Sequence, residues 1–179
     1  ALVVGAGLGT AGCALQGIFR NPLADPGIIG VSSGAALGAV GLIILGISPL
    51  GQWSIPAAAF AGGLVLTLMV YALSRRDGRT EVVTLVLTGV ALNAIAGGLI
   101  GFALFYATDA QLRSVVFWQL GSVGGATWPN VKPAVLVAVI AIVPLMRYGH
   151  RLNLLALGER EAYHLGVDTE HLRLQVIAL

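Results

Sequence analysis

Five long apolar runs limit what this chain can fold into. A helix needs about 20 apolar residues to cross about 30 Å of hydrocarbon, and helices are expected because lipid cannot satisfy open backbone groups. The sequence therefore predicts an all-α fold, a polytopic bundle of transmembrane helices. The predicted spans occupy about residues 1–19, 28–47, 56–73, 82–107 and 131–148, and a further span begins at about residue 174.

Composition excludes an ordinary soluble domain. Charged residues make up only 10% of the 179 residues and hydrophobic residues 57%, whereas soluble domains contain about 25% charged residues. The net charge of +2 provides no broad basic surface, so no nucleic-acid partner is expected. The chain starts and stops within apolar runs, and we therefore expect it to be part of a longer membrane protein.

The cationic residues fall mainly on one side of the predicted membrane. If the runs alternate, Arg113 and Lys132 lie on one side and the other eight cations on the opposite side. The positive-inside rule assigns the side with eight charges to the cytoplasm. This predicts a multi-pass membrane protein, surrounded by lipid, with a cytoplasmic segment at about 151–173. The eight cations are Arg20, Arg75, Arg76, Arg79, Arg147, Arg151, Arg160 and Arg173.

Glycines recur at helical spacing inside the apolar runs. Gly34 and Gly38 form one GxxxG pair, and Gly97 and Gly101 form another. Inside a membrane, small residues let helix backbones approach closely. Both pairs therefore predict tight helix packing.

A polar corner separates the first two runs. Asn21-Pro22 and Asp25-Pro26 cannot continue a helix, because proline lacks an N–H group and disfavours the helical conformation of the residue before it. Asn21 and Asp25 can also hydrogen-bond the local backbone in turns. Ser32 then enters the next helix shortly before Gly34. A well-made interhelical turn is one sufficient explanation of these residues.

Three stretches resemble a known family. Residues 16–40, QGIFRNPLADPGIIGVSSGAALGAV, are similar to the signature stretch of the FecCD-like permeases, the ABC importers for iron-siderophores, haem and vitamin B12. Residues 84–128 resemble the family's fifth transmembrane helix and outer segment, and residues 152–173 resemble its cytoplasmic coupling segment. The stretches keep the family's order. The signature corner then comprises Asn21, Pro22, Asp25, Pro26, Gly30, Ser32 and Gly34.

The resemblance implies an assembly. Permeases of this family have ten transmembrane helices, and this chain would supply the second to sixth and the start of the seventh. A second permease subunit, identical or paralogous, would complete a dimer in the bacterial inner (plasma) membrane. The implied partners are two ATP-binding subunits and a periplasmic or lipid-anchored substrate-binding protein; no cofactor is implied. The resemblance places these residues at the ATPase contact: Leu157, Gly158, Glu159, Ala162, Leu165 and Gly166.

The residues of the coupling segment also predict its local structure without the resemblance. Its charges would be costly in lipid. Asn153 can cap a helix start, Gly166 can serve as a left-handed stop, and Asp168 can cap a second helix. This predicts a short amphipathic helix, a break at Gly166 and a second short helix leading into the next span. An interfacial helix lying on lipid headgroups is the alternative.

Polar residues in the run at 82–107 suggest a water-lined path or a helix contact. Thr84 and Thr88 share one face and are assigned to the path, whereas Asn93 lies roughly opposite and is assigned to packing. The threonines could instead bond back to the carbonyl of residue i−4. The family resemblance places a cytoplasmic gate in the loop around Thr80 to Thr84.

No catalytic site is expected. GLGTAG at residues 7–12 matches GxGxxG, but it lacks the preceding strand and the following acid of a dinucleotide site. The sequence has no GxxxxGK[ST] loop, and its three histidines lack further zinc ligands. We therefore expect a non-enzymatic permease subunit of an ATP-driven importer, with ATP hydrolysed by a partner. The alternatives are an ion-coupled secondary transporter, which the lack of an acid inside the spans disfavours, and a structural membrane protein.

Overall fold

The computed structural model describes residues 1–76 and 79–179. Two compact units make up the chain. Unit 1 contains Ala1–Pro26 and Val123–Leu179, and unit 2 contains Gly27–Ser122. Helices dominate both units, so the predicted all-α fold is confirmed.

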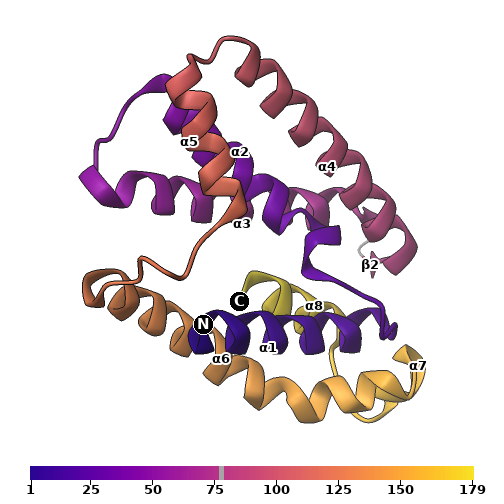
Figure 1. Cartoon of the computed structure of the whole chain (residues 1–179). Helices are drawn as coiled ribbons and strands as arrows, with labels where there is room; N and C mark the ends of the chain where they lie inside the picture. Colours follow the sequence, from indigo (N-terminus) through magenta and orange to yellow (C-terminus); the bar gives the residue numbers. More distant parts are fainter. Residues whose placement is uncertain (77–78) are drawn as a thin grey trace. The chain divides into compact units, whose positions relative to one another are not determined.

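Unit 1 is formed by four helices (Figure 1). They are α1 (Leu2–Phe19), α6 (Trp128–Ala156), α7 (Glu159–His164) and α8 (Thr169–Ala178). Helix α1 packs along α6, and α8 contacts both of them. The core lies toward the end of α1 and the second half of α6. Its buried apolar residues include Leu15, Ile18, Phe19, Leu145, Leu155, Ala162, Val167, Leu172, Val176 and Ile177.

Helix α6 is longer than the sequence predicted. The apolar run was placed at 131–148, but the helix continues to Ala156, past Pro144. Leu155 is fully buried, and the side chain of Leu152 lies 3.5 Å from the position that a Cβ at Gly17 would take. Packing against α1 thus extends the helix beyond the apolar run. The prediction that Asn153 caps a new helix is wrong, because Asn153 lies inside α6.

Unit 2 holds the remaining helices. These are the 3₁₀ turn η1 (Pro26–Ile29) at its boundary, α2 (Val31–Leu45), the 3₁₀ turn η2 (Gly51–Trp53), α3 (Ser54–Leu73), α4 (Val82–Phe105) and α5 (Asp109–Leu120). Two-residue strands β1 (Arg75–Arg76) and β2 (Arg79–Thr80) pair antiparallel before α4. Helix α2 contacts α3, α4 and α5, and α5 lies beside it in Figure 1.

Four helical stretches are long and apolar enough to cross a membrane: α1, Gly51–Leu73, α4 and α6. They correspond to four of the five predicted spans. Helix α2 has only 15 residues, about 22 Å at 1.5 Å per residue. It is shorter than the predicted span at 28–47 because residues 26–29 form η1 and Gly30 breaks the backbone with a φ of 91°.

Glycine packing joins α2 to α3. A Cβ added at Gly34 would overlap the carbonyl oxygen of Gly62, and one added at Gly38 would overlap that of Ala58. Only glycine therefore permits this approach of the two backbones, which confirms the prediction for the first GxxxG pair. The second pair behaves differently: among the described residues, nothing lies within 4 Å of a Cβ added at Gly97 or Gly101.

Helix α5 was not predicted as a separate element. It begins with a capping box, in which Thr108 Oγ1 accepts from the Gln111 N–H and Gln111 Oε1 accepts from the Thr108 N–H. The Gln111 side-chain amide also donates to the carbonyl oxygens of Ile44 (2.9 Å) and Ile43 (3.3 Å). The Gln111 side chain thus caps the start of α5 and also hydrogen-bonds α5 to the end of α2.

Candidate functional site

The first half of the signature corner lies in unit 1. Helix α1 ends where Arg20 adopts a left-handed conformation with a φ of 49°. The Asn21 N–H donates to Gln16 O (3.2 Å), and Asn21 Oδ1 accepts from the Leu23 N–H (2.9 Å). This geometry explains why Asn21-Pro22 stops the helix: the asparagine supplies the turn and the proline prevents its continuation. Asp25 is exposed, and Pro26 begins η1.

The second half of the corner lies in unit 2. Gly30 has a φ of 91°, and a Cβ there would come within 3.2 Å of the Leu66 side chain. A side chain at this position would be both strained and crowded. Ser32 is exposed on the first turn of α2, whereas Gly34 is buried against α3. The corner residues therefore divide between the two units.

Helix α4 touches this second half. Asn93 Nδ2 donates to Gly27 O at 3.0 Å, and a Cβ at Gly89 would overlap Ile28 O. A polar side chain and a close glycine contact thus join α4 to η1. The expected packing role of Asn93 is confirmed, and its contact links two of the sequence stretches that resemble one family.

The three threonines assigned to a gate or path differ in exposure. Thr80 is buried in β2, where it pairs with Arg75. Thr84 is partly exposed, and its hydroxyl donates to Glu81 Oε2 at 2.7 Å. Thr88 is partly exposed one turn further along α4. Thr84 and Thr88 lie on one helix face, and Thr80 lies inside the unit. Their role in a path stays a prediction.

Two glycines and an aspartate define the coupling segment. Gly158 precedes α7 with a φ of 132°, and Gly166 follows it with a φ of 83°. Asp168 Oδ1 accepts from the Glu170 and His171 N–H groups at the start of α8. The expected break at Gly166 and cap at Asp168 are confirmed. The hydrogen bonds from the backbone and side chain of His171 lower the pKa of Asp168 below 3.8.

The coupling segment presents apolar side chains at its surface. Leu157 is 66% exposed, Leu165 is 58% exposed, and Tyr163, which the sequence analysis did not single out, is 72% exposed. Gly166 is also exposed. We call these four residues the coupling surface. Of the remaining residues assigned to the ATPase contact, Ala162 and Gly158 are buried, while Glu159 is turned toward α8.

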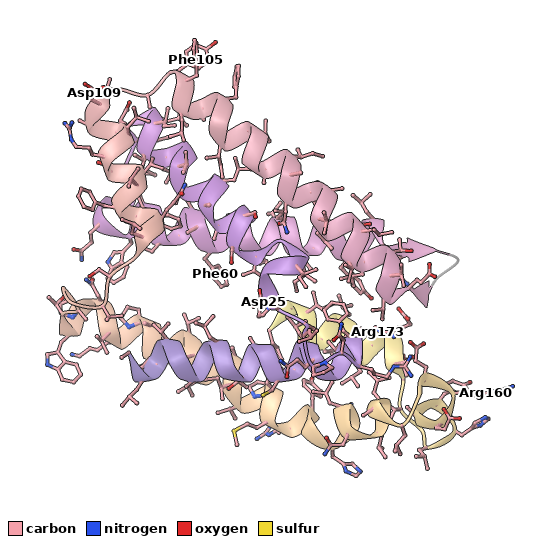
Figure 2. The ribbon with its side chains drawn as sticks, turned by 45° about the vertical axis from the view of Figure 1, so that its right-hand side comes forward. Asp25, Phe60, Phe105, Asp109, Arg160 and Arg173 are labelled. Carbon is pink, nitrogen blue, oxygen red and sulfur yellow. The ribbon has the colours of Figure 1, made fainter. Side chains whose placement is uncertain are left out.

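One arginine of the coupling segment is buried. The Arg173 guanidinium pairs through Nη2 with Glu159 Oε1, and through Nη1 with Glu170 Oε1 at 3.1 Å. Figure 2 shows Arg173 within unit 1 and Arg160 at its outer edge. The sequence analysis counted Arg173 only as a cytoplasmic charge. The available signal was its spacing from Val176 and Ile177, three and four residues later, which places the charge on an apolar face of α8.

The positions of the histidines and acids bear on metal binding. His171 Nδ1 lies 2.9 Å from Asp168 Oδ2, an exposed pair at the start of α8. Within residues 1–76 and 79–179, no group of three or more histidine, cysteine, aspartate or glutamate side chains is arranged to hold a metal ion. The polar groups of Glu159, Asp168, Glu170, His171 and Arg173 are engaged in capping and ion pairing.

Comparison with known proteins decides the family. The FecCD transport family matches residues 1–179, the whole chain. The chain belongs to the FecCD transport family. This FecCD chain is 41% identical to the hemin transport system permease protein HmuU of Yersinia pestis, over 100% of the chain and 54% of the relative. It is 38% identical to the cobalamin import system permease protein BtuC of Halobacterium salinarum, over 98% of the chain and 47% of the relative.

A solved structure shows the same fold. It is an inward-facing ABC transporter assigned to the metal-chelate type, with a TM-score of 0.89 and 34% identity. The match covers 99% of the FecCD chain and 56% of the solved chain. The FecCD chain therefore spans about half the length of the relatives it matches. Its family and its apolar helices identify it as a multi-pass protein of the inner (plasma) membrane.

Proposed function

We propose that this chain is part of the transmembrane permease subunit of an ATP-driven ABC importer. The importer carries an iron-siderophore, haem or cobalamin-type chelate into the cytoplasm. A second permease subunit, two ATP-binding subunits and a substrate-binding protein complete the assembly. The permease itself is non-catalytic, and the ATP-binding subunits hydrolyse ATP. The family match over all 179 residues carries this proposal, and relatives named for cobalamin and hemin import support the substrate class.

The coupling surface supports a partner that provides the energy. Leu157, Tyr163 and Leu165 expose apolar groups. Exposed charged residues, Arg160 and Glu161, lie between them in the sequence. The positive-inside rule places this segment in the cytoplasm, on the side where ATP is available. Exposed apolar groups with a polar rim are typical of protein contacts. We assign the groove that receives them to the ATP-binding subunit.

An energy source outside this chain is part of the proposal. The 179 residues contain no P-loop motif, and the predicted spans contain no acidic residue that would couple transport to protons or sodium. Thr84 and Thr88, on one face of α4, are our candidates for the wall of the translocation path. Thr80, in the hairpin that precedes α4, is our candidate for the cytoplasmic gate.

Reconstitution tests the proposal directly. The complete permease, its ATP-binding subunit and its substrate-binding protein are placed in liposomes with ATP inside. Labelled iron-siderophore, haem and cobalamin are then offered side by side. We expect uptake of one class that requires ATP and survives collapse of the proton gradient. Uptake that stops with the gradient while ATP is held constant would identify an ion-coupled transporter instead.

Truncation of the coupling surface tests the contact. Leu157→Ala removes an exposed apolar side chain and is expected to lower ATP-dependent uptake about tenfold, the effect of losing a central interface side chain. The readouts are uptake and co-purification of the ATP-binding subunit. Met146→Ala is the matched control, because Met146 is an apolar residue of α6 that is 72% exposed. Equal losses in both variants would contradict a specific contact at Leu157.

A further inference from the structure

Arg173 is the largest side chain buried in the described part of the protein. It is 1% exposed and lies on α8 beside the buried residues Leu172 and Val176. Arginine is almost never fully buried unless it is paired, and removing one partner of a buried ion pair leaves an uncompensated charge. The burial of this charge therefore requires its partners.

The partners come from both sides of the break at Gly166. Glu170 lies on α8, one turn before Arg173, and its side chain is 25% exposed. Glu159 is the first residue of α7, fourteen positions before Arg173, and its side chain is 45% exposed. A guanidinium has several donors in one rigid plane. Arg173 uses two of its nitrogens to hold the start of α7 against α8.

Helix α7 needs such a link because it is short. It has six residues, and helices below about 12 residues are marginal in water by themselves. Both of its flanking glycines have positive φ values, and glycine has more backbone freedom than any other residue. Apolar contact comes from Ala162 within α7, which is fully buried. The ion pair with Glu159 adds a directional contact at the other end of the helix.

We propose that Arg173 is a positioning residue of the importer, which sets the orientation of α7 through Glu159 and so presents the coupling surface to the ATP-binding subunit. The inference rests on the proposed function. It gives Glu159 a new role, since this carboxylate acts as an internal partner of Arg173 rather than as a contact with the ATPase. It also gives α7 a direct connection to α8, through which force on the coupling surface reaches the following helix.

The test uses the complete importer in liposomes and compares two pairs of matched variants. Arg173→Met removes the buried charge, and Arg160→Met makes the same change at the exposed arginine of α7. Glu159→Gln weakens the internal pair, and Glu161→Gln makes the same change two residues later. We expect Arg173→Met and Glu159→Gln each to lower the number of substrates imported per ATP about tenfold, the effect of losing a charged hydrogen bond. The two control variants should stay near the wild-type value.

A double variant separates positioning from direct contact. If Glu159 acts only through Arg173, then Glu159→Gln combined with Arg173→Met should be no worse than Arg173→Met alone. Arg173→Lys keeps the positive charge but lacks the planar guanidinium with several donors. It should recover part of the lost import per ATP. The proposal would be overturned if the losses of the two single variants multiplied in the double variant. It would also be overturned if Arg173→Met imported as many substrates per ATP as the wild type. ATP-independent uptake by the wild-type importer would instead refute the proposed function.

A distance measurement keeps the test valid if Arg173→Met fails to fold. Spin labels at positions 160 and 175 report the separation of α7 and α8 in the solubilised complete permease. Glu159→Gln leaves the buried arginine in place with Glu170. We expect it to broaden the distance distribution, whereas Glu161→Gln should leave the distribution narrow. An unchanged distribution in Glu159→Gln would show that the pair does not orient α7.

Discussion

The α2–α3 pair and the α7–α8 segment are held together in opposite ways. Between α2 and α3 the backbones meet directly, because glycines at positions 34, 38 and 62 leave no side chain in the way. Between α7 and α8 a buried guanidinium on α8 pairs with a carboxylate on α7. The first interface requires residues without side chains, and the second requires charged side chains.

The surroundings explain this difference. Lipid gives helices no hydrophobic reason to associate, so close packing must provide the attraction, and a charged group would be expensive there. The coupling segment is outside the predicted spans, where charged side chains are tolerated and direct the contact. Substitutions should therefore damage the two interfaces for different reasons, and the following variants test that expectation from the largest effect to the smallest.

Gly38→Ala should be the most damaging of these changes. Its methyl group would overlap the Ala58 carbonyl oxygen, which cannot move without shifting α3. We expect a loss of about 1–3 kcal/mol in the free energy of unfolding, the usual cost of overpacking, measured by denaturation of the complete permease in micelles. Gly41→Ala is the control on the same helix, since nothing lies within 4 Å of its added Cβ. Because alanine favours a helix more than glycine does, Gly41→Ala should be neutral or stabilising; equal destabilisation by both variants would contradict a specific close approach at Gly38.

Gln111→Glu should have an intermediate effect within unit 2. Glutamate can still complete the capping box with Thr108, but it cannot donate to the carbonyl oxygens of Ile43 and Ile44. We expect a loss of about 1 kcal/mol for the missing hydrogen bonds, seen as faster amide exchange in α5. Gln119→Glu introduces the same charge at an exposed site of α5 and should leave exchange unchanged. Unchanged exchange in Gln111→Glu would show that apolar packing alone holds α5.

Protonation of Asp168 in acid should weaken the N-terminal cap of α8, and this is the smallest effect that we expect. The pKa of Asp168 is lowered by its hydrogen bonds with His171, so the folded protein favours the ionised carboxylate. This stabilisation is present above the unfolded value near 3.8 and is lost as the pH falls through the lower folded value. The amide chemical shifts of Glu170 and His171 should therefore titrate below pH 3.8. Asp168→Asn keeps a capping side chain and should remove this titration; an unchanged titration in that variant would contradict the assignment.

The sequence could predict features that depend on neighbouring residues. The apolar runs placed α1, α3 and α4 within a few residues, and the GxxxG spacing predicted the α2–α3 contact. The late start of α2 depends on the backbone conformation of Gly30, which the amino-acid sequence alone does not specify. The capping box of α5 was visible as Thr108 and Gln111, yet its amphipathic pattern is weak, so the helix was not identified.

Features that depend on distant residues could not be predicted. The extension of α6 past residue 148 follows from Leu152 and Leu155 packing in the core of unit 1. Likewise, nothing in the sequence paired Arg173 with Glu159, because the turn at Gly166 brings them together. The sequence predicted the break at Gly166 and the cap at Asp168. Residues 151–156 of the predicted coupling segment instead belong to α6, and the internal ion pairs of the segment required the three-dimensional structure.

The length of α6 has a mechanical consequence. Its 29 residues make a rod about 43 Å long, which exceeds a hydrocarbon layer of about 30 Å. Unless it is tilted, a helix of this length extends beyond the hydrocarbon layer. Helix α6 continues without interruption to Ala156, shortly before α7 begins at Glu159. Pro144 leaves the Ile140 carbonyl without its usual backbone donor, and sharp bends in long helices occur at such prolines. A bend of α6 is therefore expected at Pro144 rather than elsewhere along the helix.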